Sequence, residues 1–171
     1  MPKFKDLASL EAYLQKNIHH VMNRSAELER VLASTMSNAV YDVVYKAYTP
    51  EVYQRRGDED GSGVGGGLAD ERNMYITSVE VVDGSVRLVF ENLTQGNEDF
   101  IPIYGQPQDS LHGKFITDTI VEGIAANWYE TGEWSNPRDF VGETAKRLRD
   151  SPAELVQAIK NGLIAKGFSV K

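Results

Sequence analysis

The sequence contains no cysteine among its 171 residues. This absence excludes disulfide frameworks, thiolate zinc sites, iron–sulfur clusters and cysteine nucleophiles. The sequence also has no stretch approaching the roughly 18 apolar residues of a membrane-spanning helix, and its first residues lack the apolar block of a signal peptide. We therefore expect a soluble protein that is made in a cytoplasm and has no membrane partner.

A basic patch is missing as well. The net charge is −7, and the acidity lies in the middle third, where residues 51–100 carry four Lys or Arg against eleven Asp or Glu. Binding to nucleic acid without sequence preference depends on clustered positive charge. The composition therefore argues against nucleic-acid binding as the main role.

No arrangement of side chains in the sequence is typical of catalysis. No serine sits in a nucleophile elbow, no His-x-x-x-His pair is present, and no spacing pairs two carboxylates. His19 and His20 are adjacent on an expected helix and so point about 100° apart, which prevents joint chelation of one ion. His112 has no recognisable partner. We expect a protein that is not an enzyme and needs no cofactor and no metal.

A glycine-rich segment runs from Gln54 to Ala69 and holds six glycines within eleven residues. Such a segment is expected to be a long mobile loop. It contains a G-x-G-x-x-G match at residues 61–66, but a dinucleotide site needs a preceding strand and a following helix, and neither is expected here. A flexible loop is the favoured interpretation.

The same loop imitates the first half of a calcium site. Asp58, Asp60 and Ser62 alternate before Gly63, but the twelfth position, where a bidentate Glu is needed, is Ala69. Asp70 is one place off. A solvated acidic loop is therefore favoured, and a small metal-dependent hydrolase or calcium-binding module using the three aspartates stays as an alternative from another functional class.

The apolar pattern predicts one α+β domain over residues 1–171, with a long N-terminal helix or helix pair. Apolar residues recur at helical spacing from Leu7 to Ala47. Asp6 or Ser9 is expected to cap the start, residues 23–25 to break the run, and Thr49-Pro50 to end it.

A hairpin is predicted over residues 75–92, because Asp83-Gly84 is typical of a two-residue type I′ turn. A two-residue loop pairs positions that sum to 167. The expected partners are Val81 with Val86, Glu80 with Arg87, Val79 with Leu88, and Thr77 with Phe90. A further strand is expected over residues 115–124.

Two C-terminal helices complete the prediction. The first is expected to use Asn136 as N-cap, Pro137 as first residue and Asp139 as third. The second is expected to start with a capping box over residues 151–154 and to run to Gly167.

Both tryptophans lie close together, in an aromatic cluster of Trp128, Tyr129 and Trp134 beside residues 137–140. These side chains either anchor a helix on the sheet or form a protein interface, where Trp, Tyr and Arg are enriched. In the second interpretation Arg138 is the main contact to a neighbouring copy, and the acidic residues of the 51–100 region of that copy are the expected target of a bidentate bond from its guanidinium. A carboxylate of the same subunit is the other possible partner. An exposed Arg138 that contributes little is the remaining alternative.

Three motifs resemble the tail-completion, or head–tail joining (neck), proteins of tailed bacteriophages. One is the end of the N-terminal helix, Tyr45-Lys-Ala-Tyr-Thr-Pro-Glu-Val-Tyr-Gln-Arg-Arg56, followed by Gly-Gly-Leu68. The second is the strand-like Ile120-Val-Glu-Gly123. The third is Asn136-Pro-Arg-Asp-Phe140 opening a helix, which resembles the family's Pro-Arg-Pro-Phe block with Asp139 in place of the second proline.

This resemblance implies a structural virion protein at the neck, assembled in the host cytoplasm. Its expected partners are further copies in a homo-oligomeric ring, typically sixfold in the family, together with the head connector or adaptor and a tail-tube or tail-terminator protein. Genome DNA would pass through the channel without specific binding. Another phage ring component, such as a tail terminator or minor capsid protein, is the closest alternative. The expected interface residues are Trp128, Tyr129, Trp134, Arg138, Asp139, Arg55 and Arg56.

Overall fold

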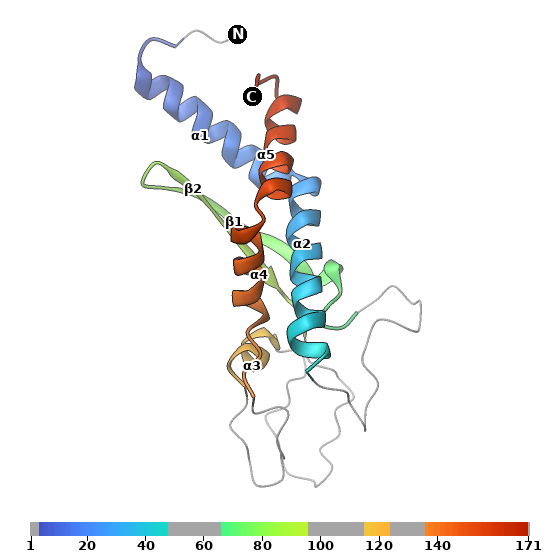
Figure 1. The fold of residues 1–171 in the computed structure, drawn as a ribbon. Coiled ribbons are helices and arrows are strands. Elements are labelled where there is room, and N and C mark those ends of the chain that lie inside the picture. The colour runs from blue at the N-terminus through green and yellow to red at the C-terminus, as the bar shows by residue number, and fades with distance from the viewer. Residues whose placement is uncertain (1–3, 48–65, 96–114, 124–135, 171) are drawn as a thin grey trace, which may run out of the picture.

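The computed structural model describes residues 4–47, 66–95, 115–123 and 136–170, and over these the chain is α+β (Figure 1). The elements, in chain order, are helix α1 (Leu7–Arg24), helix α2 (Ala26–Val40), a π-helical turn (Tyr41–Tyr45), a 3-10 turn (Glu71–Asn73), strands β1 (Met74–Val82) and β2 (Ser85–Asn92), and helices α3 (Thr117–Glu122), α4 (Phe140–Asp150) and α5 (Ala153–Ala165).

The N-terminal half forms the expected helix pair. Asp6 caps α1 by accepting a hydrogen bond from the backbone N–H of Ser9, and Ser25 caps α2 by accepting one from Leu28. Each cap satisfies an N–H that has no partner within its helix. Ser25 therefore marks the break between two helices, as its position in the sequence predicts.

The core lies mainly along α2, and Figure 1 shows that α4 and α5 lie along one side of this helix and that the hairpin crosses close to it. The main core is formed by ten buried side chains, namely Ala33, Met36, Ala39, Val40, Val44, Leu68, Ala69, Met74, Ile120 and Phe140. A second buried cluster joins α2 to α5 through Leu28, Val31, Leu32 and Ala158. Half-buried apolar residues of the hairpin, such as Ile76 and Leu88, pack on this second cluster.

The hairpin has the predicted turn and, near the turn, the predicted register. Asp83 and Gly84 have φ of +50° and +77°, as a type I′ turn requires. The pairs from Val82–Ser85 to Val79–Leu88 sum to 167. The prediction that Thr77 faces Phe90 is wrong, because Ile76 pairs with Phe90 and the register shifts between Ile76 and Ser78. The extra residue makes a β-bulge, which moves Ile76 onto the packed face of the ribbon.

Over residues 115–123, the described part of the segment 115–124, the predicted strand is absent. Phe115 makes only an isolated bridge to Gln95, and Thr117–Glu122 is the short helix α3. Side-chain packing outweighs the strand preference of its β-branched residues, because Ile120 is buried in the main core. Gly123, with φ +77°, ends the helix.

The caps of both C-terminal helices differ from the prediction. Asp139, rather than Asn136, caps α4 by accepting a hydrogen bond of 2.6 Å from the backbone N–H of Gly142. The expected capping box does not form at α5, whose N-cap residue is Pro152 with no side-chain hydrogen bond. The two proline-containing motifs therefore locate the helices correctly but misplace how they start.

The last helix ends at Ala165, two residues before the predicted end at Gly167, and Gly167 forms the turn that follows the C-cap. With φ +85°, this glycine lets its own N–H reach the carbonyl of Ile164 and the N–H of Phe168 reach the carbonyl of Leu163. This pair of bonds is a Schellman motif. Phe168 then packs on Tyr13 of α1, with ring centroids 5.8 Å apart.

Candidate assembly surfaces

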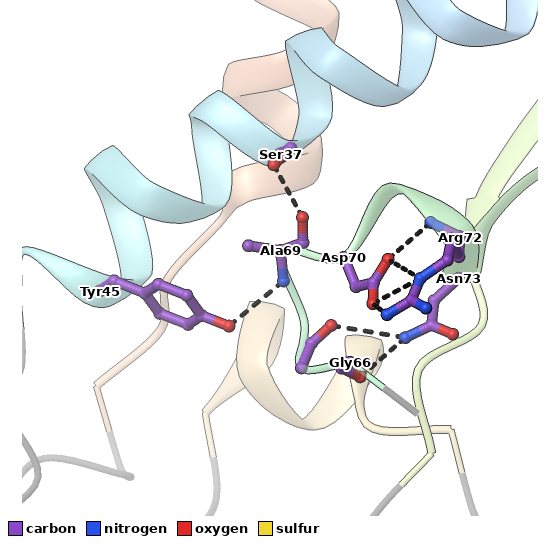
Figure 2. A network of polar contacts seen from close by, with 8 residues as sticks. Ser37, Tyr45, Gly66, Ala69, Asp70, Arg72 and Asn73 are labelled. Atoms are coloured by element: carbon purple, nitrogen blue, oxygen red, sulfur yellow. Dashed lines mark hydrogen bonds and ion pairs between the residues drawn. The ribbon is translucent and has the colours of Figure 1, made fainter. Parts of the chain in front are cut away.

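One end of the molecule is organised around the segment 66–73, which is fixed to α2 (Figure 2). Ser37 Oγ donates a hydrogen bond of 2.7 Å to the carbonyl of Ala69, and the Ala69 N–H donates one of 3.2 Å to the hydroxyl of Tyr45. Leu68 and Ala69 are buried in the main core. The loop expected over Gln54–Ala69 therefore ends earlier, since its last four residues are a fixed part of the fold. Residues 54–65 lie outside the described residues.

Asp70 and Asn73 close this segment on itself. The Asn73 side-chain amide donates to the carbonyl of Gly66 at 2.9 Å, and both carboxylate oxygens of Asp70 accept hydrogen bonds from the Arg72 guanidinium (Figure 2). These bonds from Arg72 hold the pKa of Asp70 below its ordinary value. The carboxylate proposed as a calcium ligand is thus paired with a cation. Asp58 and Asp60 lie outside the described residues, and within the described ranges no three acidic or histidine side chains gather as a metal site.

Asn92, at the end of β2, ties the segment to the rest of this end. Its side-chain amide donates to the carbonyl of Leu68 at 2.7 Å, and its Oδ1 accepts from the backbone N–H and the hydroxyl of Thr94. The Asn92 carbonyl accepts a hydrogen bond of 2.7 Å from Thr117 Oγ1, at the start of α3. Asn92 and Thr94 are both buried, so these bonds replace those to water that folding removes.

Backbone bonds extend the same junction. Leu93 N–H donates to the carbonyl of Asn73, Ile116 N–H to that of Thr94, and Arg138 N–H to that of Ile120. The described residues that flank segments 48–65, 96–114 and 124–135 therefore meet at one end of the fold. We call this the network end, made of Tyr45, residues 66–73, 92–95, 115–123 and Arg138.

Five of the seven predicted interface residues lie outside the described residues, namely Trp128, Tyr129, Trp134, Arg55 and Arg56. The structure therefore does not test their predicted role.

The structure places the remaining two predicted interface residues. Asp139 is exposed and caps α4. Arg138 is only 6% exposed, so within the described fold it is an interior side chain. Of the two roles predicted for its guanidinium, this burial favours a contact within the subunit.

The two histidines among the described residues, His19 and His20, show no shared site. His19 Nε2 lies 2.9 Å from the carbonyl of Val79 in β1, and His20 Nε2 lies 2.9 Å from Nζ of Lys166 near the end of α5. The two rings thus contact different elements, which agrees with the prediction that they do not chelate together. His112 lies outside the described residues.

A cluster of charges joins α4 to the π-helical turn. Arg147 contacts Asp42 at 2.9 Å and Glu143 at 2.8 Å, and Lys46 also contacts Asp42. Hydrogen bonds from Lys46, and then from Arg147, lower the pKa of Asp42 below its ordinary value. The Asp42–Arg147 pair links residues 105 positions apart in the chain.

The opposite end of the molecule carries an apolar groove. A groove of about 290 Å³ lies between α1 and the hairpin turn. Its lining residues are Leu7, Leu10, Glu11, Leu14, Gln15, Ile18 and Gly84. Leu7 is 78% exposed, and Gln15 bridges the two walls by a long bond of 3.4 Å to the Gly84 carbonyl. The sequence identifies Leu7, Leu10, Leu14 and Ile18 as the apolar face of a helix. Only the structure shows that this face is partly exposed among the described residues.

Helix α5 presents a second set of exposed apolar side chains. Val156 is 45% and Ile164 51% exposed, and Lys160 lies between them on the same stripe of the helix. The other side of α5 is packed, since Ala158 is buried against α2 and Gly162 approaches Val21 of α1. None of the helices in the described ranges is both long and apolar enough to cross a membrane.

The YomN family model matches residues 6–165, which is nearly the whole chain, and the chain therefore belongs to the YomN family. This family is named after a gene product of a Bacillus phage or prophage, and the protein is phage-related. No curated protein and no solved structure shows significant similarity to the chain.

Proposed function

We propose that this phage-related chain is a structural virion protein, a subunit of the tail-completion or head–tail joining ring. The family supports the phage context, and the resemblance of Tyr45–Arg56 and Asn136–Phe140 to neck proteins supports the position in the particle. The role is assembly without catalytic turnover.

The observation that carries the assembly role is that the two ends of the molecule have different surfaces. At the network end, hydrogen bonds join residues 66–73, Asn92 and Thr117 in a polar junction, and at the other end an apolar groove is open. Exposed apolar side chains gathered in a groove are typical of surfaces that bind a partner. A subunit that contacts neighbours on different sides needs two dissimilar surfaces, because heterologous contacts between identical copies close into rings.

The metal-dependent alternative is disfavoured by the pairing of Asp70 with Arg72. A second structural candidate, a tail terminator or minor capsid protein, shares the same assembly logic. The two structural roles differ in which particle forms when the protein is missing.

The test is a deletion of the gene in a phage or prophage that carries it, followed by electron microscopy of the lysate. Filled heads and complete tails that remain unjoined support the proposal. Tails of irregular length point to a terminator instead, and normal particles overturn the proposal. Mass spectrometry of purified wild-type particles measures the copy number, and expression of the intact gene in trans is the matched control.

A further inference from the structure

We propose that the groove between α1 and the hairpin turn receives the exposed stripe of α5 from a second copy of this chain. The stripe consists of Val156, Lys160 and Ile164. This contact specifies how neighbouring subunits join, and it therefore rests on the ring role proposed above.

The groove has the chemistry of a helix-binding surface. Its floor is formed by leucine and isoleucine side chains of α1, and Leu14 is 38% exposed in addition to Leu7. Glu11 is the one charged side chain among the described residues that line it. An apolar trough with a single carboxylate favours an apolar helix face that carries one cation.

The α5 stripe matches that requirement in length and charge. Val156 and Ile164 are eight residues apart, or about 12 Å along a helix, and Leu7 and Leu14 are seven residues apart, or about 10.5 Å. Lys160 lies between the two apolar residues of α5, as Glu11 lies between Leu7 and Leu14. With the helices side by side, the two apolar pairs meet and Lys160 faces Glu11.

The groove cannot be filled by α5 of the same chain. That helix is held in place by its opposite side, where a Cβ built on Gly162 would lie 2.3 Å from Val21 Cγ1 and where Ala158 is fully buried. The stripe of one copy must therefore reach the groove of another. Because the two surfaces differ, each copy offers one of each, and the contact propagates into a ring or an open chain.

The first test separates the two surfaces by mixing variants. Leu7→Glu removes the groove and leaves the stripe, and Ile164→Glu removes the stripe and leaves the groove. In analytical ultracentrifugation we expect wild-type protein to form oligomers and each variant to be monomeric. An equimolar mixture of the variants should form a heterodimer that grows no further. Val89→Glu, on the exposed outer face of the hairpin, is the matched control and should assemble as wild type.

The second test exchanges the charges. Glu11→Lys or Lys160→Glu alone should weaken self-association by about tenfold, since one charge then faces a like charge. The double variant should recover most of that loss. Circular dichroism of every variant checks that the monomer stays folded, as expected for substitutions at the partly exposed positions used here.

Three results would overturn the inference: monomeric wild-type protein, unchanged assembly of the Leu7→Glu or Ile164→Glu variant, or a mixture of the two that stays monomeric. Binding of wild-type protein, but not Leu7→Glu, to phosphatidylglycerol vesicles in place of self-association would assign the groove to a lipid surface and also overturn it. Particle composition is measured independently. If the protein is found in particles but the Leu7→Glu and Ile164→Glu variants still assemble normally, this contact is wrong and the virion role stands. If the protein self-associates as expected but is absent from particles, the virion role is wrong and the contact stands.

Discussion

Helices α1 and α2 carry similar apolar stripes but differ in how much of the stripe is buried. Eight residues of α2 are buried, whereas Val21 is the one buried residue among the described side chains of α1. Both helices have an N-cap and the same helical spacing of apolar residues. The difference teaches that periodicity identifies the apolar face of a helix but not what covers it. Other elements of the same chain bury the apolar face of α2. We propose that a second copy of the chain buries the apolar face of α1.

The largest expected effect is the difference in stability loss between a substitution in the main core and one in the groove. Phe140→Ala should lower the free energy of unfolding by about 3–5 kcal/mol, because the ring is fully buried in the main core and a cavity would remain. Leu7→Ala, the matched removal of an apolar side chain from the groove, should change it by less than about 0.5 kcal/mol. Urea denaturation of both variants measures the contrast. Equal losses would mean that the groove is part of the subunit's own core.

The next effect tests the network end. Asn92→Ala should cost about 2–3 kcal/mol, because the Leu68 carbonyl and the Thr94 donors would lose their partner in a buried place. Hydrogen exchange should show that residues 66–73 and α3 become less protected before the hairpin turn does. Ser78→Ala, whose hydroxyl makes an exposed contact to Glu80, is the control and should be nearly neutral. Uniform loss of protection would contradict a separate junction at this end.

A smaller effect concerns the place where α1 is fixed to α5. Gly162→Ala should destabilise the fold by about 1–2 kcal/mol, because the new methyl group would overlap Val21 Cγ1 and this clash exceeds the better helix propensity of alanine. Val21→Ala opens that space. The double variant should therefore lose less stability than the two single losses added together, and strict additivity in thermal unfolding would contradict direct contact.

The smallest effect is electrostatic. The pKa of Asp42 is lowered in the folded chain, so its pairing stabilises the fold at neutral pH, and this contribution is lost as the pH falls below about 4 through the folded pKa. Asp42→Asn should remove that part of the acid sensitivity in denaturation curves between pH 7 and pH 3. Because the carboxylate is solvent-exposed, added salt should reduce the difference between variant and wild type. An unchanged acid transition would contradict the pairing.

Local chemistry predicts the parts of the fold that depend on neighbours in the sequence. Asp83-Gly84 sets the hairpin turn, Ser25 breaks the N-terminal helices, and Gly167 ends the last one, since each depends on one residue's backbone preference or side-chain reach. The bulge at residues 76–78 escapes this reasoning because nothing in the local pattern demands it. It is explained by the packing of Ile76 beside Leu88 on the α2–α5 cluster.

The remaining errors arise from distant contacts. The sequence of α3 favours a strand, but Thr117 bonds the end of β2 and Ile120 enters the core, which fixes a short helix. For α4, the Asn136-Pro137 motif suggests an earlier start. Gly142 is the signal for the true cap, because a Cβ there would meet the Asp139 carboxylate at 2.2 Å.

The proposed assembly surfaces are only partly predictable from the sequence. The aromatic cluster and the Arg55-Arg56 pair are recognisable in it, and both lie outside the described residues. The groove is not predictable, because Leu7, Leu10 and Leu14 have the spacing of any core helix.

The number of residues in the π-helical turn after α2 determines where the side chain of Tyr45 lies. In this turn the Lys46 N–H bonds to the carbonyl of Tyr41, five residues back, so the turn holds one residue more than an α-helix would. Removing one residue would restore α-helical spacing and rotate Tyr45 by about 100°, away from the Ala69 N–H that it now accepts from. Related chains that keep this tyrosine contact are therefore expected to conserve the length of the turn even where they change its composition.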